Sequence, residues 1–133
     1  MSDTSPPFEI RLKRAYVAAS PDDGVRILVD RLWPRGVSKE RAALDDWKKD
    51  LAPSTALRKW FNHDPARWAD FQRRYRAELQ QHEPELNQIR SNARKGTVTL
   101  VYGARDQLHN EAVALRAVLL GKPLLKTETK DDG

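Results

Sequence analysis

The sequence predicts one compact α/β domain in which a small, mostly parallel sheet of three strands packs against four to five helices. Three observations support this prediction. Three short segments are rich in β-branched and aliphatic residues, as strands are. Between the second and third of these segments, apolar residues recur at spacings of three and four, which is typical of amphipathic helices. The length of 133 residues fits a single domain.

The first two strands are predicted at residues 9–16 and 25–32. In the first, Ile10 and Leu12 lie on one face and charged residues on the other, and this alternation of period two indicates a strand. The link between the two strands, residues 17–24, contains a proline, two aspartates and a glycine that favour a turn. Because parallel strands normally need a crossover of about a dozen residues or more, this short link favours a hairpin.

The third strand and the helices follow from the rest of the chain. Residues 97–102 are apolar on both faces, as expected of a central strand. The expected helices cover residues 38–49, 54–61, 64–83, 84–95 and about 109–121. The third of them begins at an aspartate followed by a proline, which is a strong helix start. Its apolar stripe, which predicts core packing rather than a stacking surface for bases, consists of Trp68, Phe71, Tyr75 and Leu79.

Composition sets limits on the class of protein. The predicted domain covers residues 9–121, with a flexible arm at residues 1–8 and a disordered polar tail at residues 122–133. The chain has no cysteine, which excludes disulfides, thiolate catalysis and cysteine metal sites. It has no apolar run near the roughly 18 residues needed to span a bilayer, and its first residues do not resemble a signal peptide. We therefore expect a cytoplasmic protein with no membrane partner.

The charge favours an anionic partner. The net charge is +5 and the isoelectric point is about 9.7, and the basic residues are spread over the whole chain. A small molecule that carries phosphate or carboxylate is therefore the first hypothesis. A nucleic-acid-binding or regulatory module is the alternative, because the polar face of the aromatic helix carries Arg67, Arg73, Arg74 and Arg76. A dimeric interaction domain is a third hypothesis. No cofactor or metal is predicted, because the three histidines lack zinc-ligand spacing with a partner.

Two strand-to-loop junctions, residues 28–36 and 101–106, carry the polar side chains that predict a site. Ligands of parallel α/β folds bind beyond the carboxyl ends of the strands, where helix N-termini also favour anions. Arg35 lies between a proline and a glycine that restrict its backbone, and arginine suits bidentate contact with phosphate. The candidate catalytic residues are Asp30, Asp106 and His109. The candidate ligand-binding residues are Arg14, Tyr16, Arg31, Arg35, Lys49, Ser54, Arg58, Tyr102 and Asn110.

Several of these residues also have a structural interpretation. Asp30 and Arg31 suit a strand-end ion pair as well as they suit a ligand site. His109 at a helix start favours the neutral imidazole, which can act as a base, but it also suits a plain capping residue. The segment that carries Lys49 and Arg58 either folds over the strand ends as a lid or forms a solvated face.

Five motifs resemble one family. They are Lys13–Tyr16, Leu28–Gly36, Trp47–Ser54, Leu57–Phe61 and Val98–Tyr102. Together they look like the YeaO-like branch of the family called domain of unknown function 488, over about residues 10–120. The resemblance implies a compact α/β fold whose sheet is backed by helices, and it implies no established reaction.

Broader members of that family carry a Cys-Ala-Glu segment after the last strand and a Cys-His-Arg segment at the next helix. Here the matching positions are Tyr102–Ala104 and Leu108–Asn110, so only His109 carries over. The resemblance therefore brings no thiol or redox role to this chain. Its parallel strand order also opposes the hairpin, so the second and third strands are expected to be parallel and the direction of the first is left open.

Overall fold

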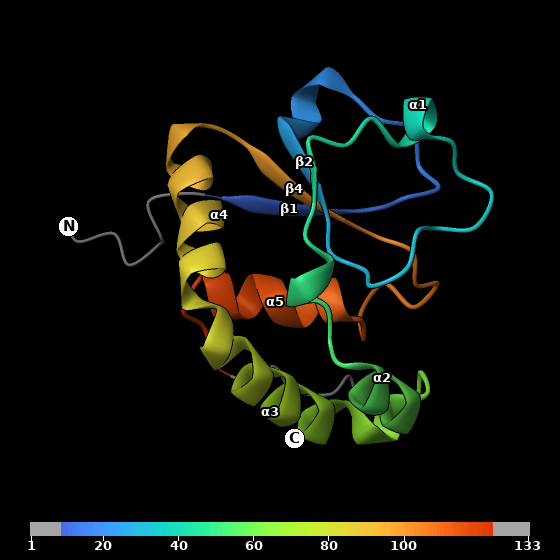
Figure 1. Ribbon diagram of the computed structural model, residues 1–133, viewed down its shortest axis with the longest axis vertical. Helices are drawn as coiled ribbons and strands as arrows, with labels where there is room; N and C mark the ends of the chain where they lie inside the picture. Colours follow the sequence, from blue (N-terminus) through green and yellow to red (C-terminus); the bar gives the residue numbers. More distant parts are fainter. Residues whose placement is uncertain (1–8, 124–133) are drawn as a thin grey trace, which may run out of the picture.

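The computed structural model describes residues 9–123, and a parallel sheet runs through its centre (Figure 1). The strands are β1 (Ile10–Arg14), β2 (Val25–Leu28), β3 (Asp46–Trp47) and β4 (Val98–Tyr102). Their order across the sheet is β1-β4-β2-β3, and every neighbouring pair is parallel. The α/β class is confirmed, but the sheet has four strands rather than three. The predicted arm at residues 1–8 and most of the predicted tail lie outside the described residues.

The first two strands do not form a hairpin. β4 lies between them and pairs with both, so the hairpin prediction is wrong and the open direction of β1 is parallel. The chain returns from β1 to β2 through residues 15–24, which include a 3-10 turn (Pro21–Asp23). Gly24 makes this return possible. Its φ is 64°, and a Cβ atom at this position would lie 2.1 Å from the carbonyl oxygen of Thr97.

The strand β3 lies inside a segment that the sequence predicts to be helical. The helix expected over residues 38–49 is wrong, because only the single turn α1 (Lys39–Ala42) forms and Ala43 then adopts a left-handed backbone. The chain continues along the open edge of β2, where the amide of Asp45 donates to the carbonyl of Arg26 at 2.8 Å. Backbone N–H and C=O groups at a strand edge need hydrogen-bond partners. Pairing with the edge of β2 supplies them here, and it outweighs a weak local preference of this segment for helix.

The longer helices pack on one face of the sheet. They are α2 (Thr55–Phe61), α3 (Trp68–Leu79), α4 (Glu83–Lys95) and α5 (Glu111–Leu119), and Figure 1 shows them gathered away from the loops around α1. The predicted aromatic stripe of α3 is confirmed as core, because all four of its side chains are buried in the same hydrophobic cluster as Ile27 and Leu100 of the sheet. Among the described residues, no helix has the length and apolar character needed to cross a bilayer.

Loops cover the opposite face of the sheet and enclose a buried ion pair there. Asp23 Oδ2 accepts a hydrogen bond from Arg26 Nη1 at 2.6 Å, and both side chains are at most 5% exposed. Lys13 Nζ lies 3.0 Å from Asp23 Oδ1. Burial alone would raise the pKa of Asp23, but the hydrogen bonds from Lys13, the Ser20 amide and Arg26 outweigh it and lower the pKa below 3.8. This network ties the turn before β2 to β1 and β2.

Candidate ligand-binding site

A cavity of about 590 Å³ opens at the carboxyl ends of β1, β2 and β4. Three strand-to-loop junctions meet there, as parallel strands in this order require. Its aromatic and apolar walls come mainly from the loop after β2, and its polar groups come from that loop, the loop after β4 and the first residue of α5. The lining residues are Tyr16, Asp30, Leu32, Trp33, Pro34, His63, Gly103, Ala104, Arg105, Asp106 and Glu111.

Two carboxyl groups face each other in this cavity. Asp30 Oδ2 accepts a hydrogen bond from the Gly103 amide at 2.8 Å, whereas Asp30 Oδ1 is buried and receives no backbone or neutral side-chain donor among residues 9–123. Burial raises the pKa of Glu111 well above its ordinary value of 4.5, and the hydrogen bond to Asp30 and the charge of Asp30 raise it further. Only a protonated carboxyl can donate to a carboxylate. The hydrogen bond between Glu111 and Asp30 therefore forms while Glu111 is protonated, which the raised pKa of Glu111 favours.

A second polar pair lies in the loop before α5. His109 Nδ1 is 2.9 Å from Asp106 Oδ2, and Asp106 Oδ1 accepts the amides of Leu108 and His109 at 2.9 and 3.0 Å. Burial would raise the pKa of Asp106, but these hydrogen bonds outweigh it and lower the pKa. The His109 ring packs edge-on against Trp68 with its centroid 5.3 Å away. Asp106 lines the cavity and His109 does not, so the pair fixes the loop and presents only its carboxylate to a ligand.

Several predicted site residues do meet at this edge. Tyr16, Asp30 and Asp106 line the cavity. Arg14 does not line the cavity but contacts two residues that do. Its Nε donates to the Ala104 carbonyl at 2.8 Å, and its guanidinium lies 5.0 Å from the ring centre of Tyr16. Tyr102 is almost fully buried in the core.

Asn110 has a structural role as the cap of α5. Its Oδ1 accepts the amide of Val113 at 3.0 Å, and its Nδ2 donates to the carbonyl of Asp106 at 2.8 Å. The side chain is buried and does not line the cavity. Its contribution to the site is to set where α5, and therefore Glu111, begins.

The predicted basic residues lie outside the cavity. Arg35 is exposed, and it contributes only its carbonyl, which accepts the Tyr16 hydroxyl at 3.0 Å. Lys49 Nζ sits 4.5 Å from the ring centre of Trp47. Arg58 is exposed on α2 and reaches the site only through its charge, which lowers the pKa of Glu111 slightly against the larger effects.

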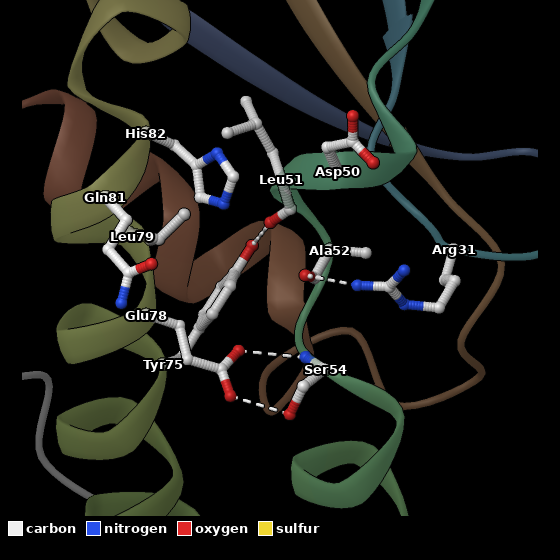
Figure 2. A pocket seen from close by; sticks show the side chains of 10 residues that line it. All are labelled: Arg31, Asp50, Leu51, Ala52, Ser54, Tyr75, Glu78, Leu79, Gln81 and His82. Atoms are coloured by element: carbon white, nitrogen blue, oxygen red, sulfur yellow. Dashed lines mark hydrogen bonds between the residues drawn. The ribbon is translucent and has the colours of Figure 1, made fainter.

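Arg31 belongs to a different, smaller pocket of about 250 Å³ (Figure 2). Its Nε and Nη2 donate to the carbonyls of Pro53 and Ala52 at 3.2 and 3.3 Å. Ser54 lies in the same pocket, where its amide and hydroxyl donate to the two carboxylate oxygens of Glu78 at 2.8 and 2.7 Å. These polar groups satisfy one another and tie the start of α2 to α3. Arg31 and Ser54 are therefore structural contacts rather than a lid over the strand ends.

Glu111 is the site residue that sequence reasoning missed. An acidic residue in the first turn of a helix is explained by the helix dipole alone, so nothing in the local sequence marks it as part of a site. His63, which was not predicted, also lines the cavity, as does Arg105 from the predicted junction at residues 101–106. Among residues 9–123, no three histidine, aspartate or glutamate side chains are grouped so that they could hold a metal ion.

The fold and the cavity define a small parallel α/β domain with a ligand-sized hollow at the carboxyl edge of its sheet. The chain belongs to the family described as the inactive DUF488-N3 subclade, whose model matches residues 9–132. This agrees with the resemblance seen in the sequence motifs.

Two relatives extend this assignment. The uncharacterised protein YeaO of Escherichia coli (strain K12) is 47% identical over 108 residues, which cover 81% of this chain and 94% of YeaO. The uncharacterised protein Rv3073c of Mycobacterium tuberculosis is 38% identical over 113 residues, which cover 85% of this chain and 95% of the relative. No solved structure gives a significant match.

Proposed function

We propose that this protein is a ligand-binding domain whose cavity at the carboxyl edge of the sheet holds a small polar molecule. The observation that carries the proposal is the Asp30–Glu111 carboxyl pair inside that cavity. Taking two acidic groups out of water is costly, and among residues 9–123 neither of them forms an ion pair that would stabilise the fold. Groups with strongly shifted pKa values in a concave site are a mark of function. The volume also lies within the range of about 300–1,000 Å³ typical of small-molecule sites.

Binding is favoured over catalysis. The subclade to which the chain belongs is described as inactive. The candidate base His109 has its Nδ1 engaged by Asp106 and its ring packed on Trp68. Acid–base chemistry by Asp30, Asp106 and His109 is therefore the alternative, and it requires the His109 ring to reach a bound molecule.

An anionic ligand is a second candidate, which Arg105 favours. Arg105 is the one arginine that lines the cavity among the described residues. Phosphate or carboxylate held by Arg105 would lie at the rim, away from the carboxyl pair. The earlier candidates Arg31 and Arg35 do not line this cavity, so they have no part in this version of the proposal.

The arginines of α3 and of the turn before it give a nucleic-acid module little support, because three of them contact other side chains and the Nε and Nη2 atoms of Arg76 are buried. Arg67 and Arg74 lie over the ring of Trp60, with the guanidinium carbon 5.3 and 4.2 Å from its centre. Arg73 forms an ion pair with Asp70. A binding titration against duplex and single-stranded DNA at low salt tests this alternative, which requires affinity that falls steeply as salt is added.

A thermal-shift screen of amines, alcohols and phosphorylated metabolites tests the proposal, because a ligand at roughly 100 times its Kd stabilises the folded state by about 2.7 kcal/mol. The screen is run on the parent, on Arg105→Ala and on Arg35→Ala, two exposed loop arginines of which only the first lines the cavity. We expect ligands whose effect changes in Arg105→Ala and stays the same in Arg35→Ala. A screen without a stabilising compound, or with hits that depend only on Arg35, contradicts the proposal.

A further inference from the structure

We propose that the cavity takes a primary amine, whose ammonium group lies between the carboxyl groups of Asp30 and Glu111, two residues of the cavity lining. This inference rests on the proposed function, because it names the ligand class of the same cavity. It assigns to the carboxyl pair the role of a cation receptor, in which the ammonium takes the place of the proton in the hydrogen bond between the two groups.

The hydrogen-bonding groups of the pair fit an ammonium ion. Of the oxygens of Asp30, Oδ2 is engaged by the Gly103 amide and Oδ1 is buried without a backbone or neutral side-chain donor among the described residues. An ammonium group carries three N–H donors and no acceptor. It can therefore donate to carboxylate oxygens of both residues at once. The hydrogen bond between Glu111 and Asp30 supplies only a single donor.

The charges around the pair leave this position open to a cation. Charged and titratable groups from several neighbouring elements act on Asp30, Glu111 or the two tyrosines beside them. They are Arg14 at the end of β1, Arg31 after β2, Arg58 on α2, Tyr75 and Glu78 on α3, Tyr102 on β4, and Asp106 before α5. Arg14 and Arg31 direct their guanidinium groups at backbone carbonyls. Arg58 is exposed, so water screens its charge. His63, Arg105 and Tyr16 complete the titratable lining.

The walls of the cavity suit the organic part of an amine. Leu32, Trp33 and Pro34 form an apolar and aromatic side. The ring faces of Trp33 and Tyr16 also attract cations within about 6 Å. An anion that reached the floor would instead meet the negative charge of Asp30, which its hydrogen bond to Gly103 keeps in place. The lining therefore selects for a positive end at the floor and an apolar body at the wall.

The exchange of ammonium for proton has a measurable consequence. The only covalent bond that breaks is the O–H bond of Glu111: the ammonium enters, Glu111 ionises, and its proton passes to water or buffer. The observed affinity should therefore rise roughly tenfold per pH unit while the free pair holds its proton, and should level off once the pair has lost it.

Isothermal titration calorimetry tests the inference with methylamine, n-butylamine, 2-phenylethylamine and 1,4-diaminobutane, each compared with its alcohol. Titrations in two buffers of different ionisation enthalpy count the protons. We expect at least one amine to bind at least tenfold more tightly than its alcohol and to release about one proton per molecule at pH values below the folded-state pKa of Glu111. Glu111→Gln should abolish the proton release, and Glu40→Gln, at an exposed glutamate on α1, should not.

The outcomes separate this inference from the proposed function. If alcohols bind as well as amines, or if amine binding releases no proton, the cavity still binds ligands but the cation inference is wrong. If phosphorylated compounds bind and amines do not, the cation inference is also wrong, and the result favours Arg105 as the anchor of an anion. If no compound of any charge binds, both proposals fail.

Discussion

Replacing Asp30 should separate its role as a hydrogen-bond acceptor from its role as a charge. Asp30→Ala removes the acceptor of the Gly103 amide, whose nitrogen lies 2.8 Å from Oδ2. Asp30→Asn can keep an oxygen on Gly103 while it turns its amide nitrogen to the buried position of Oδ1, beside Glu111. The two variants therefore differ in hydrogen bonding at one fixed backbone position.

The expected magnitudes follow from these contacts. A buried N–H group left without an acceptor costs about 1–3 kcal/mol, so Asp30→Ala should lose about 2 kcal/mol of unfolding free energy. Asp30→Asn should stay within about 1 kcal/mol of the parent at low pH, where Glu111 is protonated, because both hydrogen bonds are replaced. As pH rises through the folded-state pKa of Glu111, Asp30→Asn should become more stable than the parent, because Glu111 then ionises next to an N–H donor rather than next to a carboxylate.

The sign of the pH dependence follows from the raised pKa of Glu111. A raised pKa means that the folded state holds a proton more tightly than the unfolded state. The stability that protonated Glu111 contributes is therefore fully present below pH 4.5, and it is lost as pH rises through the folded-state pKa. Urea unfolding at about pH 5 and about pH 8 measures this, with Asp22→Asn, at an exposed aspartate, as the control. The reasoning is refuted if Asp30→Ala is as stable as the parent, or if Asp30→Asn at high pH loses as much as Asp30→Ala.

Two further predictions concern contacts outside the cavity. Asp23→Ala leaves the buried Arg26 guanidinium without its carboxylate and should cost about 3–5 kcal/mol of unfolding free energy, measured in urea. In the parent, the stability that this ion pair contributes should be lost only as pH falls through the lowered pKa of Asp23, below 3.8. An unchanged unfolding midpoint would show that the ion pair contributes nothing. Glu78→Ala removes the two carboxylate oxygens that accept from the Ser54 amide and hydroxyl, and it should cost about 1–2 kcal/mol of unfolding free energy in chemical denaturation. It should leave the affinity of ligands for the cavity unchanged in the ligand titrations.

The sequence predicts those parts of the fold that local periodicity determines. The aromatic stripe of α3 and the apolar strand β4 follow from their own spacing, and both are buried as expected. β3 does not, because its two residues, Asp46 and Trp47, become a strand only through the open edge of β2. The hairpin prediction fails for a similar reason, since β4 inserts between β1 and β2 from far along the chain.

The site is partly predictable for the same physical reason. The strand ends locate the cavity, because parallel strands finish at one edge. The neighbours Asp30 and Arg31 nevertheless point to different pockets, since successive side chains of an extended segment face opposite sides. Glu111 meets Asp30 only because β2 and β4 are adjacent in the sheet, and no local pattern encodes that adjacency.

The most direct test of the central claim is the carboxyl-carbon NMR titration of Glu111 in the folded protein, with and without a bound amine. We expect the pKa of Glu111 to lie well above 4.5 in the free protein, because of burial and the neighbouring Asp30, and to fall when the ammonium binds. Asp30→Asn should also lower it. A Glu111 carboxyl that titrates at or below 4.5 in the free protein would contradict the hydrogen bond from protonated Glu111 to Asp30, and a pKa that does not respond to the amine would contradict the exchange.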